Sequence, residues 1–458
     1  MSDEKQSTTS PATADKGAPL TATTSFPTGP VQRPSGWMYK GFKIGKHEVW
    51  YASPIVQLIM VALVCFMCPG MFNAVTGLGA GGQLDPTATN DANTALYSTF
   101  AVVGFFSGTI ANKLGVRITL GFGGLGYCIY VASLLSYNHN KNYGFVVFAG
   151  AFLGVCAGLL WTAQGTIMMS YPPEKNKGRY ISLFWGIFNL GGVIGSLVPL
   201  GQNIHTTNQG TVNDGTYIGF IVLTIVGAML SLALVNANRV VRHDGSKVIL
   251  MANPTWKTEL KGLLETITGS PWVVLLFPMF FASNSFYTYQ LNNMNGAHFN
   301  VRTRSLNSVL YWSSQIVGAI ITGFLLDFGS VRRSVRAKAS FVALFIISFA
   351  IWGGGWAWQR KQAIREVATA EDYKGIDWTD GGEQYIAPMF LFMFYAFFDA
   401  VWQTCIYWYE TFFLLFFGCG FRGSREPSPH SGHMDRPSRA APSAYWRFSA
   451  FNVRLAFI

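Results

Sequence analysis

An acidic side chain stands in the middle of a long apolar run at residues 385–409. On a helix, Asp399 is followed by Trp402 and Gln403 at i+3 and i+4, so one face would present a carboxyl group, an indole and an amide. An Asp at the centre of a bilayer costs about 2.5–3.5 kcal/mol, so such a residue faces a bundle interior or a wet cavity. This face could bind a cation, a proton or a small polar solute. The alternative is a hydrogen bond between helices that only fixes their packing.

Two other apolar runs carry polar side chains that could line the same cavity. The fourth run contains Trp161 and Gln164 at i and i+3, without an acid. The seventh run carries Asn284, Tyr287 and Gln290 near its outer end, and a polar, Asn-rich span end suggests an unwound or water-lined segment. The alternatives are an amide that only holds helices together and a span that ends earlier.

A polar turn of about five residues interrupts the apolar sequence twice, each time after the second span of a set of six. The turns are GTIANKLGVR at 108–117 and GFLLDFGSVRR at 323–333. Glycine permits positive φ and close helix approach, and the cations can meet helix carboxyl ends. A merely basic turn is the alternative. The residues that we expect to gate one side of the membrane are Gly108, Asn112, Lys113, Gly115, Arg117, Gly323, Asp327, Gly329, Arg332 and Arg333.

The elements that must position these residues are membrane-spanning helices. The chain has 458 residues, of which 50% are hydrophobic and 12% charged, against about 25% charged in soluble domains. A run of about twenty apolar residues crosses a hydrocarbon core roughly 30 Å thick as a helix. We therefore predict an all-α polytopic membrane protein. Ten such runs are present: 51–76, 92–111, 117–136, 144–169, 180–201, 216–237, 272–291, 305–326, 338–358 and 385–409.

The net charge of +11 is distributed as a topology signal. Counted from Lys40, the loops on the side of the amino terminus hold seventeen lysines and arginines, and the alternate loops hold seven, Arg302 and Arg304 among them. Cytosolic loops carry the excess of Lys and Arg, so we expect a cytosolic amino terminus. The partner that this distribution predicts is the lipid bilayer, and it argues against nucleic acid.

The two polar turns resemble the loop signature of the major facilitator superfamily, although Asn112 stands where that family prefers Asp and cannot supply its charge. GLLWTAQGTIMMSYPPEKNKGRYISLFWGIFNLGGVIGSLVPLG at 158–201, with FPMFFASNSFYTYQLNNMN at 277–295 and FFDAVWQTCIYWY at 397–409, is similar to the fungal branch of the Unc-93-like family. The resemblance implies two pseudo-symmetric six-helix halves around a shared cavity. It does not imply a cargo, because some animal relatives are described as channel regulators or receptor escorts.

The spans and the composition predict five segments along the chain. The linker between the halves includes 253–272, which has the apolar spacing of an interfacial helix or of a soluble linker helix. Two spans of the family pattern are missing after residue 409, so we expect a truncated or wrongly framed end. The segments are a disordered cytosolic tail (1–49), a six-helix half (50–238), a cytosolic linker (239–271), a four-span second half (272–409) and an atypical tail (410–458).

Two function classes fit these observations. The first is a secondary transporter that moves an unidentified small solute or ion by alternating two halves around a midplane cavity. The second is a non-transporting membrane protein that escorts or regulates a channel or receptor. A pore is less favoured because no ring of charges or filter-like run occurs. No nucleotide-binding, catalytic-serine or metalloprotease motif is present, so we expect neither enzyme activity nor a cofactor or metal site.

Overall fold

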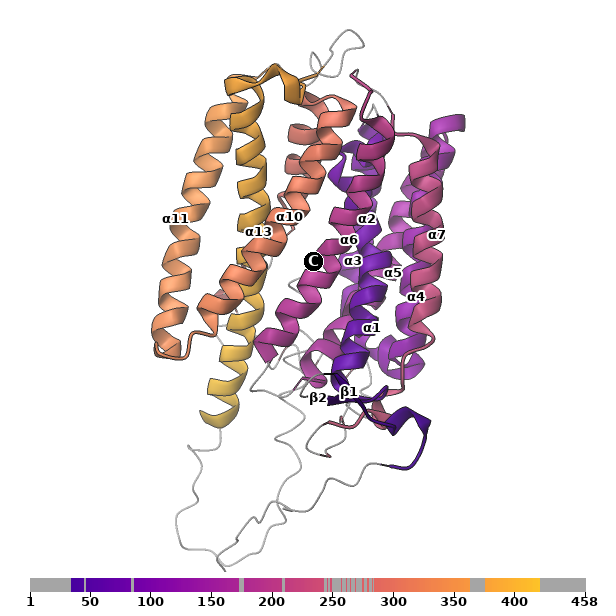
Figure 1. Cartoon of the computed structure of the whole chain (residues 1–458), viewed down its shortest axis with the longest axis vertical. Helices are drawn as coiled ribbons and strands as arrows, with labels where there is room; N and C mark the ends of the chain where they lie inside the picture. The colour runs from indigo at the N-terminus through magenta and orange to yellow at the C-terminus, as the bar shows by residue number, and fades with distance from the viewer. Residues whose placement is uncertain are drawn as a thin grey trace, which may run out of the picture.

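Long apolar helices make up most of the described chain (Figure 1). In this computed structural model, nine of the described helical segments are long and apolar enough to cross a membrane. The prediction of an all-α polytopic membrane protein is therefore confirmed. The structure describes residues 34–44, 47–83, 86–172, 177–207, 211–242, 284–362 and 375–420, with some single residues between 245 and 282.

The first half contains six membrane-length segments, of which the first is broken. Helices α1 and α2 meet at Cys68 (φ −97°, ψ −84°), because Pro69 lacks the backbone N–H that would continue the helical ladder. Helix α5 packs against α3 and α4, and α6 packs against α1 and α2. The helices are α1 (Pro54–Met67), α2 (Pro69–Gly77), α3 (Thr87–Leu114), α4 (Val116–Asn140), α5 (Tyr143–Ser170), α6 (Lys177–Asn203) and α7 (Asp214–Ser231).

The second half begins, within the described residues, at the end of the seventh predicted span. Most of that span lies outside the described residues, and its end is a π-helical segment, η5 (Tyr289–Gly296). Helix α13 packs against α10 and α11, and α10 also packs against α6 of the first half. The remaining elements are α10 (Val301–Leu326), α11 (Arg333–Gln359), the 3₁₀ turn η6 (Trp378–Asp380) and α13 (Gly382–Gly420).

Short elements close the two ends of the bundle in Figure 1. At the lower end, β1 (Phe42–Ile44) and β2 (His47–Val49) form an antiparallel pair after η1 (Trp37–Tyr39), near η4 (Ala237–Arg239). The upper end holds η2 (Ala80–Gly82), the residues that follow α6, and η6. We use these two names, upper end and lower end, throughout.

Three predictions about segments change in the structure. The disordered tail predicted for 1–49 does not extend over the described residues after 33, because the strand pair forms there and Tyr39 Oη donates to the Arg239 carbonyl at 2.8 Å. Helix α13 continues through Gly420, so the boundary at 410 falls inside a helix. Arg304, counted with the loop cations, is buried in α10 and donates to the Gly296 carbonyl at 3.4 Å.

The linker helix predicted for 253–272 lies largely outside the described residues. Within it, Lys257, Lys261 and Leu264 are helical and exposed. The other boundaries of the five predicted segments stay predictions.

Candidate functional site

The carboxyl group of Asp399 lies at the centre of a polar cluster inside the second half. Its side chain is fully buried in α13. Tyr287 Oη and Gln315 Nε2 each donate to Oδ2 at 2.6 Å, and Gln403 Nε2 donates to Oδ1 at 3.4 Å. The donors come from the turn before η5, from α10 and from α13 itself. A desolvated carboxylate requires such donors, because burying a charge without them carries a large penalty.

A cavity of about 120 Å³ lies beside this cluster and is lined by both halves. A cavity needs roughly 10–15 Å³ to hold one water molecule, so this cavity has room for several. Of the predicted site residues, Trp161, Asn284, Tyr287 and Gln403 line it. Asp399 does not line the cavity itself. The three side chains that donate to it, Tyr287, Gln315 and Gln403, do line the cavity and lie between it and the carboxyl group.

The structure places the other predicted cavity residues elsewhere. The Trp402 ring packs on Phe398, with ring centroids 5.5 Å apart, and is not among the lining residues. Gln164 is buried at 3% exposure without lining the cavity. Gln290 is also buried, and its Oε1 accepts from Tyr311 Oη at 2.7 Å. Gln403, four residues after Asp399, therefore belongs to the polar cluster, whereas Trp402, three residues after it, does not.

Sequence reasoning missed several cavity residues, although a signal existed for some of them. Gln315 is an amide inside an apolar span, the same signal that singled out Gln164. Asn189 stands in the fifth span next to a glycine pair, which drew attention to packing instead. Tyr97 and Trp312 also line the cavity, but no local pattern distinguishes these aromatic residues from packing residues.

Aromatic rings form one wall of the cavity in the first half. Trp161 of α5 meets Phe188 of α6 edge to face, with centroids 5.4 Å apart, and Trp185 lies 5.4 Å from the same phenyl ring. These three residues all line the cavity, as do Phe72 and Tyr97. The wall therefore combines apolar ring surface with the polar side chains opposite it.

The first polar turn is tighter than predicted. Gly115 (φ 80°) alone separates α3 from α4, and Lys113 lies exposed in the last turn of α3. Arg117 donates to the carbonyl of Leu232, the residue that caps the carboxyl end of α7. The first turn thus combines a glycine of positive φ with a cation at a helix end, and its role in gating stays a prediction. Two further members lie in α3: Gly108 is buried and Asn112 is half-buried.

The second polar turn also meets a helix end, but through a cation other than those proposed. Arg336 donates to the carbonyl of Leu326 at the end of α10, whereas Arg332 is the residue before α11. A Cβ on Gly323 would lie 2.6 Å from Ser182 Oγ, so this glycine allows α10 to approach α6. Asp327 is exposed and makes no ion pair with any described residue. Gly329 does not have a positive φ, and the side chain of Arg333 lies outside the described atoms.

At the upper end, η5 is hydrogen-bonded to the first half. Asn292 Oδ1 accepts from the Ala80 backbone at 2.8 Å, and its Nδ2 donates to Asn90 Oδ1 at 2.6 Å. Asn295 Nδ2 donates to the Gly77 carbonyl at 2.8 Å. Asn292 also lines the cavity, so these bonds close the cavity on the side of the upper end.

Glycines make this approach of the two halves possible. Gly79 has φ 76°, and a Cβ at this position would overlap the backbone of Gly296 in η5. Only glycine combines a left-handed conformation with such a contact.

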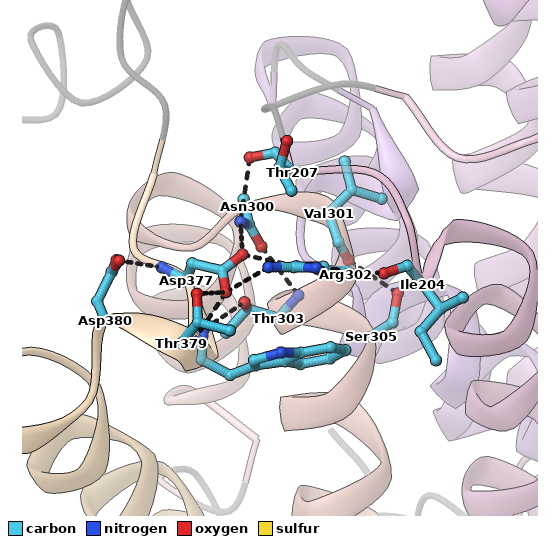
Figure 2. Close-up of polar contacts among 11 residues, drawn as sticks. Ile204, Thr207, Asn300, Val301, Arg302, Thr303, Ser305, Asp377, Thr379 and Asp380 are labelled. Atoms are coloured by element: carbon cyan, nitrogen blue, oxygen red, sulfur yellow. Dashed lines mark hydrogen bonds and ion pairs between the residues drawn. The ribbon is translucent and has the colours of Figure 1, made fainter.

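A charged cluster at the upper end, shown in Figure 2, adds a second connection between the halves. The guanidinium group of Arg302 donates to both oxygens of Asp377, at 2.6 and 2.8 Å, and lies 4.9 Å from the Trp378 ring. Arg302 and the nearby Asn300 also donate to backbone carbonyls of the segment that follows α6. Arg302 Nη1 donates to the Ile204 carbonyl at 3.5 Å, and Asn300 Nδ2 donates to the Thr207 carbonyl at 3.1 Å.

The electrostatics of this cluster favour the charged form of Asp377. Burial opposes its charge, but hydrogen bonds from Arg302, Thr379 and Asn300 outweigh burial and hold the pKa of the Asp377 carboxyl well below its usual range. His298 lies nearby in the chain and packs edge to face on Trp358. Burial lowers the pKa of the His298 imidazole to about 4, so this ring is neutral at pH 7.

Comparison with known proteins gives the family. The model of the Major Facilitator Superfamily matches residues 49–369. An UNC93-like protein of Schizosaccharomyces pombe is 50% identical over 382 residues, which cover 83% of this chain and 75% of that protein. UNC93-like protein 1 of Arabidopsis thaliana is 40% identical over 405 residues, which cover 88% of this chain and 86% of that protein.

The solved structures that align with this chain are much more distant in sequence. The xylose transporter XylE from E. coli aligns over 88% of this chain and 98% of its own, with a TM-score of 0.46 and 12% identity. Because the family model covers more than half of the chain and the relatives match most of their own length, the chain belongs to the UNC93-like proteins of the Major Facilitator Superfamily.

Proposed function

We propose that this protein is a secondary transporter that moves a small solute by alternating access, with Asp399 as its proton- or cation-sensitive group. The observation that carries the proposal is a fully buried carboxyl group, bonded by Tyr287, Gln315 and Gln403, directly behind the wall of a cavity between two halves. Ionisable residues inside membrane spans mark ion pathways and proton relays.

The charge distribution supports one orientation of the proposed transporter. The exposed cations Lys113 and Arg332 and the half-buried Arg117 lie at the lower end, with Lys43 of the strand pair. Since cytosolic loops carry the excess of Lys and Arg, the lower end and the amino terminus face the cytosol. In this orientation, the bonds of η5 and of the Arg302–Asp377 pair join the halves on the side away from the cytosol.

Three helical segments meet at Asp399, which suggests how charge and conformation are coupled. With Asp399 ionised, Tyr287 before η5 and Gln315 of α10 both donate to the same oxygen, Oδ2, and so hold these segments to α13. A proton on that oxygen would displace at least one of the two donors, because a protonated carboxyl oxygen carries a hydrogen of its own. η5 would then be free to move relative to α10 and to release its bonds at the upper end.

The test is uptake into vesicles that contain the purified full chain. A trapped pH dye reports proton movement after each of D-glucose, uridine, glutamate, choline and potassium is added under an imposed pH gradient. We expect Asp399→Asn to abolish pH-dependent uptake, because an amide cannot bind and release a proton. Asp214→Asn is the control, since that acid lies at the upper end beside His139 and away from the cavity.

Two outcomes would contradict the proposal. Unchanged pH-dependent uptake by the Asp399→Asn variant would remove the role of this carboxyl group. Absence of flux for every solute, together with a second membrane protein that co-purifies in fixed ratio, would favour a non-transporting escort or regulator instead.

A further inference from the structure

The described side chains that line the cavity carry no formal charge. Its polar members are amides, hydroxyl groups and indoles, and neither Lys, Arg, His, Asp nor Glu is among the described lining residues. Asp399 stands behind them, and both of its oxygens already accept hydrogen bonds. An ion that entered the cavity would lose its hydration without meeting an opposite charge, which carries a large penalty.

Two buried polar atoms at the cavity have no hydrogen-bond partner among the described residues. Asn189 Oδ1 of α6 is an acceptor, and Trp312 Nε1 of α10 is a donor; the two side chains are 1% and 2% exposed. Both residues line the cavity, one from each half. Because buried polar groups are nearly always bonded, this pair indicates a ligand that offers a donor to one half and an acceptor to the other.

The position of the Trp312 indole is set by small residues around it. A Cβ on Gly192 would lie 2.8 Å from Trp312 Cγ, and a Cβ on Gly77 would lie 2.8 Å from Trp312 Nε1. The absence of side chains at both glycines lets the ring lie between α2 and α6. The unbonded N–H is therefore held in place by packing, with little freedom to find another partner.

Resting on the proposed transport function, we propose that the cavity binds a small, neutral ring that carries hydroxyl groups. A hydroxyl group can donate to Asn189 and accept from Trp312, whereas a carboxylate lacks the donor and a metal cation lacks the acceptor. The rings of Trp161, Trp185 and Phe188 offer the flat apolar surface against which the faces of such a molecule pack. Monosaccharides, cyclitols and nucleosides share this chemistry.

Binding is tested apart from transport, on the purified full chain in detergent. The probes are D-glucose and myo-inositol for the carbohydrate source, uridine for the nucleoside source, and glutamate, choline and potassium for charged solutes. Ligand-induced change in tryptophan fluorescence gives the Kd of each. We expect at least one neutral ring to bind, and none of the charged solutes.

Two substitutions address the pair of unbonded atoms. Trp312→Phe keeps most of the packing and removes the N–H, and Asn189→Ala removes the acceptor. Each lost hydrogen bond should weaken binding of the neutral ring about tenfold. Trp356→Phe is the control, because that indole is 65% exposed on α11, far from the cavity lining.

The outcomes separate this inference from the proposed function. Binding of charged solutes alone, binding of no probe, or unchanged Kd in both Trp312→Phe and Asn189→Ala would overturn the neutral-ring site. Asp399-dependent uptake of glutamate, choline or potassium would overturn it too, while leaving transport intact. Tight binding of a neutral ring without any flux would instead overturn transport and keep the site.

Discussion

The two ends of the bundle hold the halves in different ways. At the upper end, Asn292 and Asn295 bond to the backbone of the other half, and the Arg302–Asp377 pair reaches the chain after α6. At the lower end, Arg117 and Arg336 bond to helix ends within their own halves. Side-chain donors on backbone carbonyls, Asn295 and Arg302 at one end and Arg117 and Arg336 at the other, thus join the halves at the upper end and stabilise each half separately at the lower end. Asn292 differs, because its Oδ1 accepts from the Ala80 backbone.

Under the alternating access proposed above, this difference determines which hydrogen bonds a change of state must break. Opening the upper end requires loss of bonds between halves, whereas opening the lower end leaves the bonds of Arg117 and Arg336 intact. Substitutions at the two ends test this asymmetry.

The contact between Gly79 and Gly296 should be the most sensitive point. Gly79→Ala places a side chain in a left-handed conformation and against the η5 backbone, which costs about 2–5 kcal/mol for backbone strain and overlap combined. Gly115→Ala is the matched control, because Gly115 has φ 80° but nothing within 4 Å of an added Cβ. Apparent unfolding midpoints in detergent should fall much further for Gly79→Ala. Equal decreases of the midpoint in the two variants would show that the positive φ alone, and not the contact with Gly296, causes the loss of stability.

The Arg302–Asp377 pair should come next. Arg302→Ala leaves Asp377 without the guanidinium group that bonds both of its oxygens, and we expect the population with a closed upper end to fall by up to about fivefold. A cysteine at the cavity residue Thr76 would report this as faster labelling by a membrane-impermeant maleimide added on the side of the membrane that the upper end faces. An unchanged labelling rate would show that the Arg302–Asp377 pair does not contribute to closure of the upper end.

Acid should weaken the same end in two steps. The pKa of His298 is lowered to about 4 from an unfolded value near 6.5, so the folded form disfavours the proton and stability falls as pH drops from about 6.5 to 4. The depressed pKa of Asp377 contributes stability that is full above about pH 4 and is lost below it. We would measure the unfolding midpoint between pH 7 and pH 3. In Asp377→Asn the decrease below about pH 4 should disappear, and in His298→Gln the decrease between about pH 6.5 and 4 should disappear.

The lower-end arginines should have the smallest effect. Arg117→Ala and Arg336→Ala each remove a cation from the carboxyl end of a helix, which is worth about 0.3–1 kcal/mol. Because the two contacts lie in separate halves, their effects on the unfolding midpoint should add in the double variant, and Thr76 labelling should not change. A strong non-additive effect would indicate that the two turns communicate.

The sequence predicted the membrane class and most of the spans because these depend on local composition. Nine of the ten apolar runs have a counterpart among the described membrane-length helices, and the tenth lies mostly outside the described residues. Helical spacing also placed Gln403 beside Asp399, since i and i+4 share a face.

The remaining site depends on contacts between distant segments, which no local pattern encodes. Gln315 and Tyr287 meet Asp399 only because α10 and the turn before η5 pack on α13. The role of Gly79 depends on Gly296, more than two hundred residues later in the chain. Sequence periodicity describes which face of a helix is apolar but not which helix it meets.

The π-helical winding of η5 has a mechanical consequence. A π-helix bonds each N–H to the carbonyl five residues earlier, one residue further than an α-helix, so its side chains follow a different angular spacing. Rewinding this segment as an α-helix would rotate Asn292 and Asn295 away from the backbone of Ala80 and Gly77 without any tilt of a whole span. Rewinding of this one segment could thus release the hydrogen bonds between the halves at the upper end. Slow amide exchange of residues 289–296 during turnover would contradict this mechanism.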